Sequence, residues 1–321
     1  KDAPAAYRPH ALHAQERAFP ESNCYVDLWI ELLHERGLDP MPALAFTLSS
    51  DFEGDQWTFF KPRLADLEAL YGVEVEELNV YRPLDVHIAE QLGHGRSVLV
   101  EADSFHLPDT AGTNYRLEHG KTTIGPLAID VEARSLRYLH NLGCYELGAE
   151  DFDGALRLLP GEAAVLPPYV EIAKWDRSVA RSCAELVEIA RAQVRVHLAR
   201  GPVDDPVGRL AARFVDDLAH LTKGDLAAFH RYAFATLRQL GACFEIAAAF
   251  ARWLGASSEP FADDAARAAA SFDELSGAAK ALLFKTARAV NGKRAFDPRP
   301  LFESMSAARH AGRAAMYAAV A

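Results

Sequence analysis

The sequence changes character near Pro167, and this change limits how the chain can fold. Before it, short apolar runs of strand type alternate with amphipathic helical segments; after it, Ala, Leu and Arg recur at helical spacing between Gly, Pro and Asp. At 321 residues the chain is longer than a single compact core usually requires. We therefore predict an α+β domain over residues 1–160 and an all-helical domain over residues 161–321.

Capping and turn residues delimit the expected elements. In the first half we predict helices over 24–37, 61–72 and 83–95, strands over 74–80 and 97–103, and a strand or extended segment over 43–52. A long polar loop then leads into a hairpin over 121–141 that turns near residues 132–135. In the second half we predict helices over 168–200, 206–221, 224–255, 262–269 and 275–290, and one after Pro300.

Charge and cysteine usage exclude several classes of partner. The formal net charge of -11 repels phosphate backbones and anionic lipid surfaces, so we expect neither nucleic acid nor membrane as a partner. The four cysteines form no CxxC pair, which argues against a structural zinc or a disulfide framework. The N-terminal residues lack the apolar core of a signal peptide. We expect a cytoplasmic protein without a bound metal.

Cys24 is the strongest candidate for a chemical role. It follows Ser22 and Asn23, either of which can cap the helix predicted to start there. A thiol in a first helical turn is acidified by the helix dipole, and the unpaired N–H groups of that turn can bind an oxyanion. Taken alone, a cysteine at such a position is more often a small buried hydrophobe.

A histidine and an asparagine follow Cys24 in an order that strengthens its candidacy. His119 stands at the entrance to the predicted hairpin, and Asn141 stands at its end. In papain-like enzymes the nucleophile, the base and the residue that orients the base lie on a helix start, a strand start and the next strand. Asn141 fits the third role better than Asp130, which lies near the turn, and Asp103 is another candidate for positioning His119.

These residues carry a resemblance. The stretch from NCYVDLWIELL through VLVEADSFHLPDTAGTNYRLEHGKTTIG to YLHN resembles the papain-like N-terminal domain of the butirosin biosynthesis protein H family and of a related bacterial family of uncharacterised proteins. It covers about residues 20–150, and a helical region follows, as in that family. The motif comprises the early cysteine, Asp103 and Phe105 before Leu107–Pro108, and the histidine. The family's second strand tends to end in Asp-Pro, whereas here Leu142 follows Asn141.

The resemblance implies an enzyme and its partners. It implies an acyltransferase that takes an aminoacyl or acyl group from a carrier-protein thioester onto Cys24 and passes it to an amine, with His119 as the base. The amine acceptor is a small molecule or a protein. No cofactor is implied beyond the phosphopantetheine that belongs to the carrier protein. A second copy of the chain is a further expected partner, because the apolar content of the helical half is compatible with a homodimer.

Several other polar and aromatic residues are candidates for contacting substrate. Asn23 precedes the cysteine, and Trp57 lies in a segment whose acidic and aromatic residues are expected to line an acceptor pocket. Asp103, Asp109 and Tyr115 lie in the polar loop before His119. Solvated loop chemistry explains the loop residues equally well.

Two further functions remain open at this point. A papain-like cysteine hydrolase, either a peptidase or an amidase, would use the same residues and deliver water. A non-catalytic binding protein on the same fold would use its helical half for partner contact.

Overall fold

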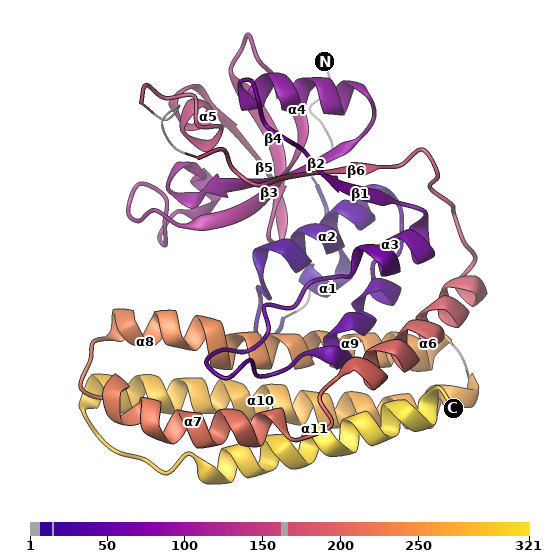
Figure 1. Cartoon of the computed structure of the whole chain (residues 1–321), viewed down its shortest axis with the longest axis vertical. Helices are drawn as coiled ribbons and strands as arrows, with labels where there is room; N and C mark the ends of the chain where they lie inside the picture. The colour runs from indigo at the N-terminus through magenta and orange to yellow at the C-terminus, as the bar shows by residue number, and fades with distance from the viewer. Residues whose placement is uncertain (1–6, 15, 162–165, 258) are drawn as a thin grey trace. The chain divides into compact units, whose positions relative to one another are not determined.

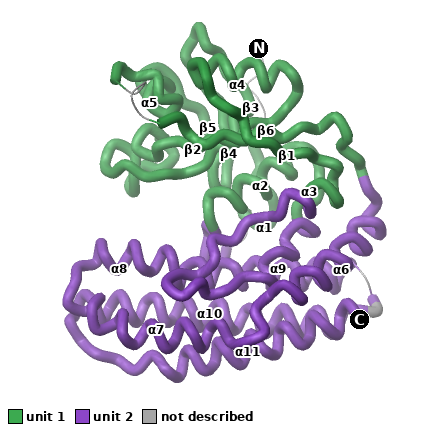
Figure 2. The backbone as a smooth tube through the Cα atoms, in the orientation of Figure 1, with its two compact units in different colours: residues 1–15, 23–40, 67–180 green, residues 16–22, 41–66, 181–321 purple. Residues whose placement is uncertain are grey.

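The computed structural model describes residues 7–14, 16–161, 166–257 and 259–321. It divides the chain into two compact units, coloured separately in Figure 2. The sheet unit comprises residues 1–15, 23–40 and 67–180, and the helical unit comprises residues 16–22, 41–66 and 181–321. The α+β and all-helical halves predicted above are therefore present. Their division differs from the predicted one, because the sheet unit continues beyond residue 160 and residues 41–66 join the helices.

The sheet unit is built on a six-stranded antiparallel sheet in the order β1-β6-β2-β3-β4-β5 (Figure 1). Its strands are β1 (Glu74–Glu77), β2 (Ser97–Asp103), β3 (Lys121–Asp130), β4 (Ser135–His140), β5 (Gly143–Gly148) and β6 (Val170–Lys174). Its helices are α1 (Ala11–Ala14), α2 (Cys24–Glu35), α4 (Leu84–Gly93) and α5 (Ala149–Ala155). Helix α3 (Leu64–Tyr71) crosses from the helical unit into the sheet unit.

Strand alternation gives the sheet two differently covered faces. On one face, Val98, Val100 and Ala102 of β2 join a buried cluster that includes residues of α4 and α5. The other face carries α2, which lies so close to β3 that a Cβ at Gly125 would come within 2.8 Å of Leu28 Cδ1. By the same alternation, Leu99, Glu101 and Asp103 of β2 point to the α2 face, and Asp103 is the last of these.

The helical unit consists of long helices with buried apolar stripes. Its elements are the 3-10 helix η1 (Met41–Ser49), α6 (Cys183–Arg200), α7 (Pro206–Leu221), α8 (Leu226–Ala233), η5 (Phe234–Arg238), α9 (Gln239–Ser257), η6 (Glu259–Phe261), α10 (Ala262–Gly292) and α11 (Arg299–Ala319). Helices α9, α10 and α11 pack together in sequence order, as the orange-to-yellow helices of Figure 1 show. None of the helices in the described part of the chain combines the length and apolar character needed to cross a membrane.

The structure differs from the expected elements in several places. Helix α10 runs without a break through both of the helices expected at 262–269 and 275–290. Residues 168–200 do not form one helix, because residues 170–174 form β6, which pairs with β1 and β2, and α6 begins only at Cys183. Residues 43–52 are not a strand: most of them form η1, a buried apolar run whose sequence gives no helical or strand periodicity. Strand β5 and helix α5 were not expected. They directly follow the predicted hairpin, and β5 pairs with its second strand, β4.

Gly72 is a position where the fold requires glycine, which gives a first testable prediction. Its φ is +69°, and a Cβ there would lie 2.1 Å from the Arg177 carbonyl oxygen. Gly37 has a similar φ of +71° but open space around its Cα. We expect Gly37→Ala to lower the free energy of unfolding by about 1–2 kcal/mol through left-handed backbone strain alone. Gly72→Ala should cost about 1–3 kcal/mol more through the clash, measured by urea denaturation. Equal losses in the two variants would contradict the clash.

Candidate active site

Cys24 occupies the first position of α2, on the face of the sheet that this helix covers. Asn23 is the N-cap residue, with extended backbone angles (φ -148°, ψ 155°), and its side-chain oxygen accepts the Val26 N–H at 3.0 Å. The cap starts the helix at the cysteine, so the thiol lies in the turn where the helix dipole is positive. The thiol is half-buried and free, and its Sγ lies 3.7 Å from Thr123 Oγ1 of β3.

His119 is paired with Asp103, directly before β3. Its Nδ1 lies 2.5 Å from Asp103 Oδ2, and the second carboxylate oxygen accepts the N–H groups of Phe105 and Gly120 at 3.0 and 3.1 Å. Burial favours the neutral acid, but the bonds from His119 and from the two N–H groups outweigh it and hold the pKa of Asp103 below its usual range. The ionised carboxylate therefore fixes Nδ1 as the protonated nitrogen and leaves Nε2 to accept a proton.

An aromatic contact fixes the plane of the imidazole. The His119 ring stacks on Phe105, with ring centroids 4.4 Å apart and planes within 15°. The Arg116 guanidinium lies 5.7 Å from the centre of the Phe105 ring. The side chain of His119 is nevertheless 73% exposed. The imidazole is thus oriented on one side and open to an incoming molecule on the other.

The register of the β2–β3 ladder relates the thiol to the His119–Asp103 pair. Thr123, which touches the thiol, faces Glu101 across the ladder, and Asp103 faces Lys121. These two rows lie on the same face of the sheet and are two residues apart, a spacing of about 7 Å. An ion pair connects the two rows, because Lys121 Nζ lies 2.5 Å from Glu101 Oε1. Among the described residues, no hydrogen bond joins the thiol to His119.

Asn141 does not hold the imidazole in this structure. It lies in the turn between β4 and β5 with a left-handed φ of +45°, a conformation that asparagine tolerates. Asp130 is also remote from the imidazole, because it pairs with Ser135 at the far end of the hairpin and its side chain accepts the Ala133 N–H. Of the three side chains considered from the sequence, Asp103 is the one that contacts His119.

The two parts of the chain match two family models. Residues 8–175 match the DUF1839 N-terminal domain, and residues 183–317 match the DUF1839 C-terminal domain. The chain belongs to the DUF1839 family. A comparison with curated proteins gave no match. The boundary between the two DUF1839 domains falls between β6 and α6, which agrees with the end of the sheet and not with a division at residue 160.

Asp109, a predicted substrate contact, lies in a buried polar network of the DUF1839 N-terminal domain. It accepts the Tyr138 hydroxyl and pairs with His140 Nδ1 at 2.5 Å, and His140 Nε2 lies 2.7 Å from Thr122 Oγ1. Burial and the Asp109 charge raise the pKa of Tyr138. The network lies on the face opposite the thiol and fastens the long loop to the hairpin. Alternation along the hairpin was the sequence signal that could have placed His140 beside Thr122.

The remaining predicted substrate contacts also have structural partners. Tyr115 donates its hydroxyl to Asp151 of α5 at 3.0 Å, which anchors the loop. The Asn23 side chain caps α2. Trp57 is 1% exposed in the helical unit, where its ring packs on Phe244, so it offers no surface to an acceptor. Within the described part of the chain, no three His, Cys, Asp or Glu side chains gather in an arrangement suited to a metal ion.

Proposed function

We propose that this DUF1839 chain is a cysteine-dependent acyltransferase in which Cys24 carries the acyl group as a thioester. The observation that carries the proposal is the Asp103–His119 pair, which lies on the same face of the sheet, and by the same end of β3, as the thiol. A helix start acidifies a thiol, and a carboxylate-oriented imidazole is the usual base for one. In this proposal Asp103 has the role that the sequence had favoured for Asn141.

The proposed reaction has two steps that share one proton carrier. His119 Nε2 takes the Cys24 proton, and the sulfur attacks the carbonyl carbon of the donor thioester. The donor carbon–sulfur bond breaks, and the departing thiol takes the proton from His119. An amine then attacks the Cys24 thioester and loses a proton to His119, which returns it to Cys24 Sγ as the carbon–sulfur bond breaks. First-turn N–H groups of α2 stabilise the oxyanion in both steps.

The reaction requires the imidazole and the thiol to approach each other. The thiol touches Thr123, whose row in the β2–β3 ladder lies about 7 Å along β3 from the row that contains Asp103. Catalytic hydrogen bonds are often long before substrate binds and tighten afterwards. The exposed imidazole has room to move toward Thr123, while the N–H groups of Phe105 and Gly120 keep the Asp103 carboxylate in place.

The resemblance to the butirosin biosynthesis protein H family supports the choice of donor and acceptor. It favours a papain-like arrangement of α2 against β3, an aminoacyl or acyl group delivered on the phosphopantetheine of a carrier protein, and an amine acceptor. The four free cysteines suit a reducing compartment such as the cytoplasm.

The chain contains its own control for a test of the nucleophile. Cys183 is the first residue of α6 and follows the N-cap Ser182, as Cys24 follows Asn23 in α2. Cys183 is exposed, but its neighbour in the cap is the carboxylate of Glu185, which bonds to Ser182. We expect iodoacetamide at pH 7 to label Cys24 at least about ten times faster than Cys183, although Cys24 is less exposed. Peptide mass mapping over time gives both rates.

A thioester substrate then tests acyl transfer itself. Incubation with glycyl-pantetheine should add one glycyl mass to the wild-type chain, and Cys24→Ser should not form a thioester adduct that hydroxylamine removes. Amine-dependent loss of the adduct supports transfer, whereas equal loss in water without amine favours the cysteine hydrolase. Labelling of Cys24 no faster than Cys183, together with no adduct, would overturn the proposal.

A further inference from the structure

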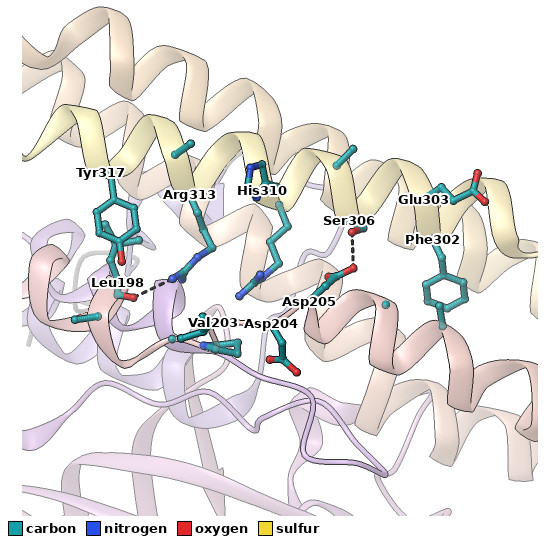
Figure 3. Close-up of a pocket in the computed structure, with 18 of the residues that line it drawn as sticks. Leu198, Val203, Asp204, Asp205, Phe302, Glu303, Ser306, His310, Arg313 and Tyr317 are labelled. Carbon is teal, nitrogen blue, oxygen red and sulfur yellow. Dashed lines mark hydrogen bonds between the residues drawn. The ribbon is translucent and has the colours of Figure 1, made fainter.

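A cavity of about 980 Å³ lies within the helical unit, between α11 and the segment that joins α6 to α7. Figure 3 shows Arg313 reaching from α11 to the carbonyl of Leu198, and Asp205 bonded to Ser306. Apolar side chains, among them Leu198, Val203 and Phe302, make up part of its wall. Its volume is that of a small-molecule site.

Arg309 is a buried cation that lines this cavity without a partner. The residue is 6% exposed, and within the described part of the chain its Nε and Nη2 atoms are buried and have no hydrogen-bond partner. Burial and the nearby charge of Arg313 lower the pKa of Arg309 to about 10, so the guanidinium is still protonated at neutral pH. An unpaired buried charge is costly, and a bound anion would remove that cost.

The acidic residues near Arg309 are engaged elsewhere. Asp51 and Asp204 both pair with Arg209, at 2.5 and 2.8 Å. Asp205 accepts the Val207 N–H at the start of α7 and the Ser306 hydroxyl. Arg313, another arginine of the cavity, donates to the carbonyl groups of Leu48 and Leu198. The guanidinium of Arg309 is thus left without a bonded carboxylate among the described residues.

We propose that this cavity binds a small carboxylate with an aliphatic body, whose carboxylate group pairs with Arg309. A carboxylate accepts charge-assisted hydrogen bonds from a guanidinium, and the apolar wall suits a hydrocarbon chain. The charges of the cavity favour a monoanion over a phosphate dianion. Three carboxylates and three guanidinium groups line it, so their charges balance and leave no excess positive charge for a dianion: Asp204, Asp205 and Glu303, with Arg299, Arg309 and Arg313. The proposal does not depend on the chemistry of Cys24.

Titration calorimetry of the full chain with octanoate tests the proposal. We expect saturable binding to the wild type, and a loss in affinity of at least about tenfold in Arg309→Met. Octanol should bind at least about tenfold more weakly than octanoate, because it lacks the charge. Arg252→Met, which removes an exposed arginine paired with Asp273, is the matched control and should bind octanoate as the wild type does.

Thermal unfolding separates a binding role from a structural one. If Arg309 is kept for a ligand, Arg309→Met removes a buried unpaired charge and should leave Tm unchanged or raise it. If Arg309→Met does not fold, Arg309→Lys serves instead, and it should weaken octanoate binding because an ammonium lacks the planar fork. A lowered Tm with unchanged octanoate affinity would overturn the proposal, as would octanol or inorganic phosphate binding more tightly than octanoate.

Discussion

Replacing His119 by alanine is expected to slow acylation of Cys24 by about 10²–10⁴-fold, the usual contribution of a positioned acid–base group. The imidazole is 73% exposed, and Asp103 keeps its bonds from Phe105 and Gly120 without it. The variant should therefore fold normally. The rate of thioester formation, followed by intact mass after mixing with glycyl-pantetheine, measures the effect.

An exposed histidine elsewhere in the sheet unit provides the control. His94 follows α4, and its side chain is 57% exposed. His94→Ala should acylate at the wild-type rate, and Asp103→Asn should fall between the two, because the amide still accepts the backbone N–H groups but carries no charge for the imidazole. A His119→Ala variant that acylates within about threefold of the wild type would contradict the role of His119 as base.

The largest effect on stability is expected for a substitution of His13, which forms a buried ionic cluster with two carboxylates of α2. Its Nε2 lies 3.3 Å from Asp27 Oδ1, its Nδ1 pairs with Glu31, and all three side chains are 0% exposed. Glu31 also accepts the Tyr7 hydroxyl and the His10 N–H, which fastens the segment before α2 to the helix. His13→Ala leaves two buried carboxylates without the cation between them. We expect a loss of about 3–5 kcal/mol in the free energy of unfolding.

The pH dependence of the unfolding free energy provides a second test of the same cluster. Burial lowers the pKa of His13, but its bonds to Asp27 and Glu31 and their charges outweigh burial and raise it above 6.5. A raised pKa in the folded state means that this contribution is complete below about pH 6.5 and is lost as pH rises through the folded-state value. The difference in unfolding free energy between wild type and His13→Ala should therefore shrink with increasing pH. Urea denaturation between pH 6 and 9 measures it, and a difference that grows with pH would contradict the cluster.

Local signals predicted the elements that depend on neighbours in sequence. The cap at Asn23 and the apolar face that follows it placed α2, and period-two alternation between two turns placed the β3–β4 hairpin. Helical spacing likewise separated the second half as all-helical. These features are predictable because capping, turn geometry and side-chain periodicity act over a few residues.

Other parts of the fold had no local signal. Strand β6 is five residues long and mostly buried on both faces, so its sequence lacks alternation, and its place between β1 and β2 depends on partners about 70 to 100 positions away. Segment 41–49 is mostly apolar, without helical or strand periodicity, and its helical form became visible only from its packing in the helical unit. Long-range pairing leaves no local trace in such segments.

The same distinction between local and long-range interactions applies to the candidate site. The sequence by itself determined that Cys24 starts a helix and that His119 enters a strand, because both follow from caps and turns. The tertiary structure decided that Asp103 holds His119, that Asn141 closes a turn and that Arg309 is buried beside a cavity. Which side chains meet across a sheet or between helices depends on register and packing, and these are fixed by the whole fold.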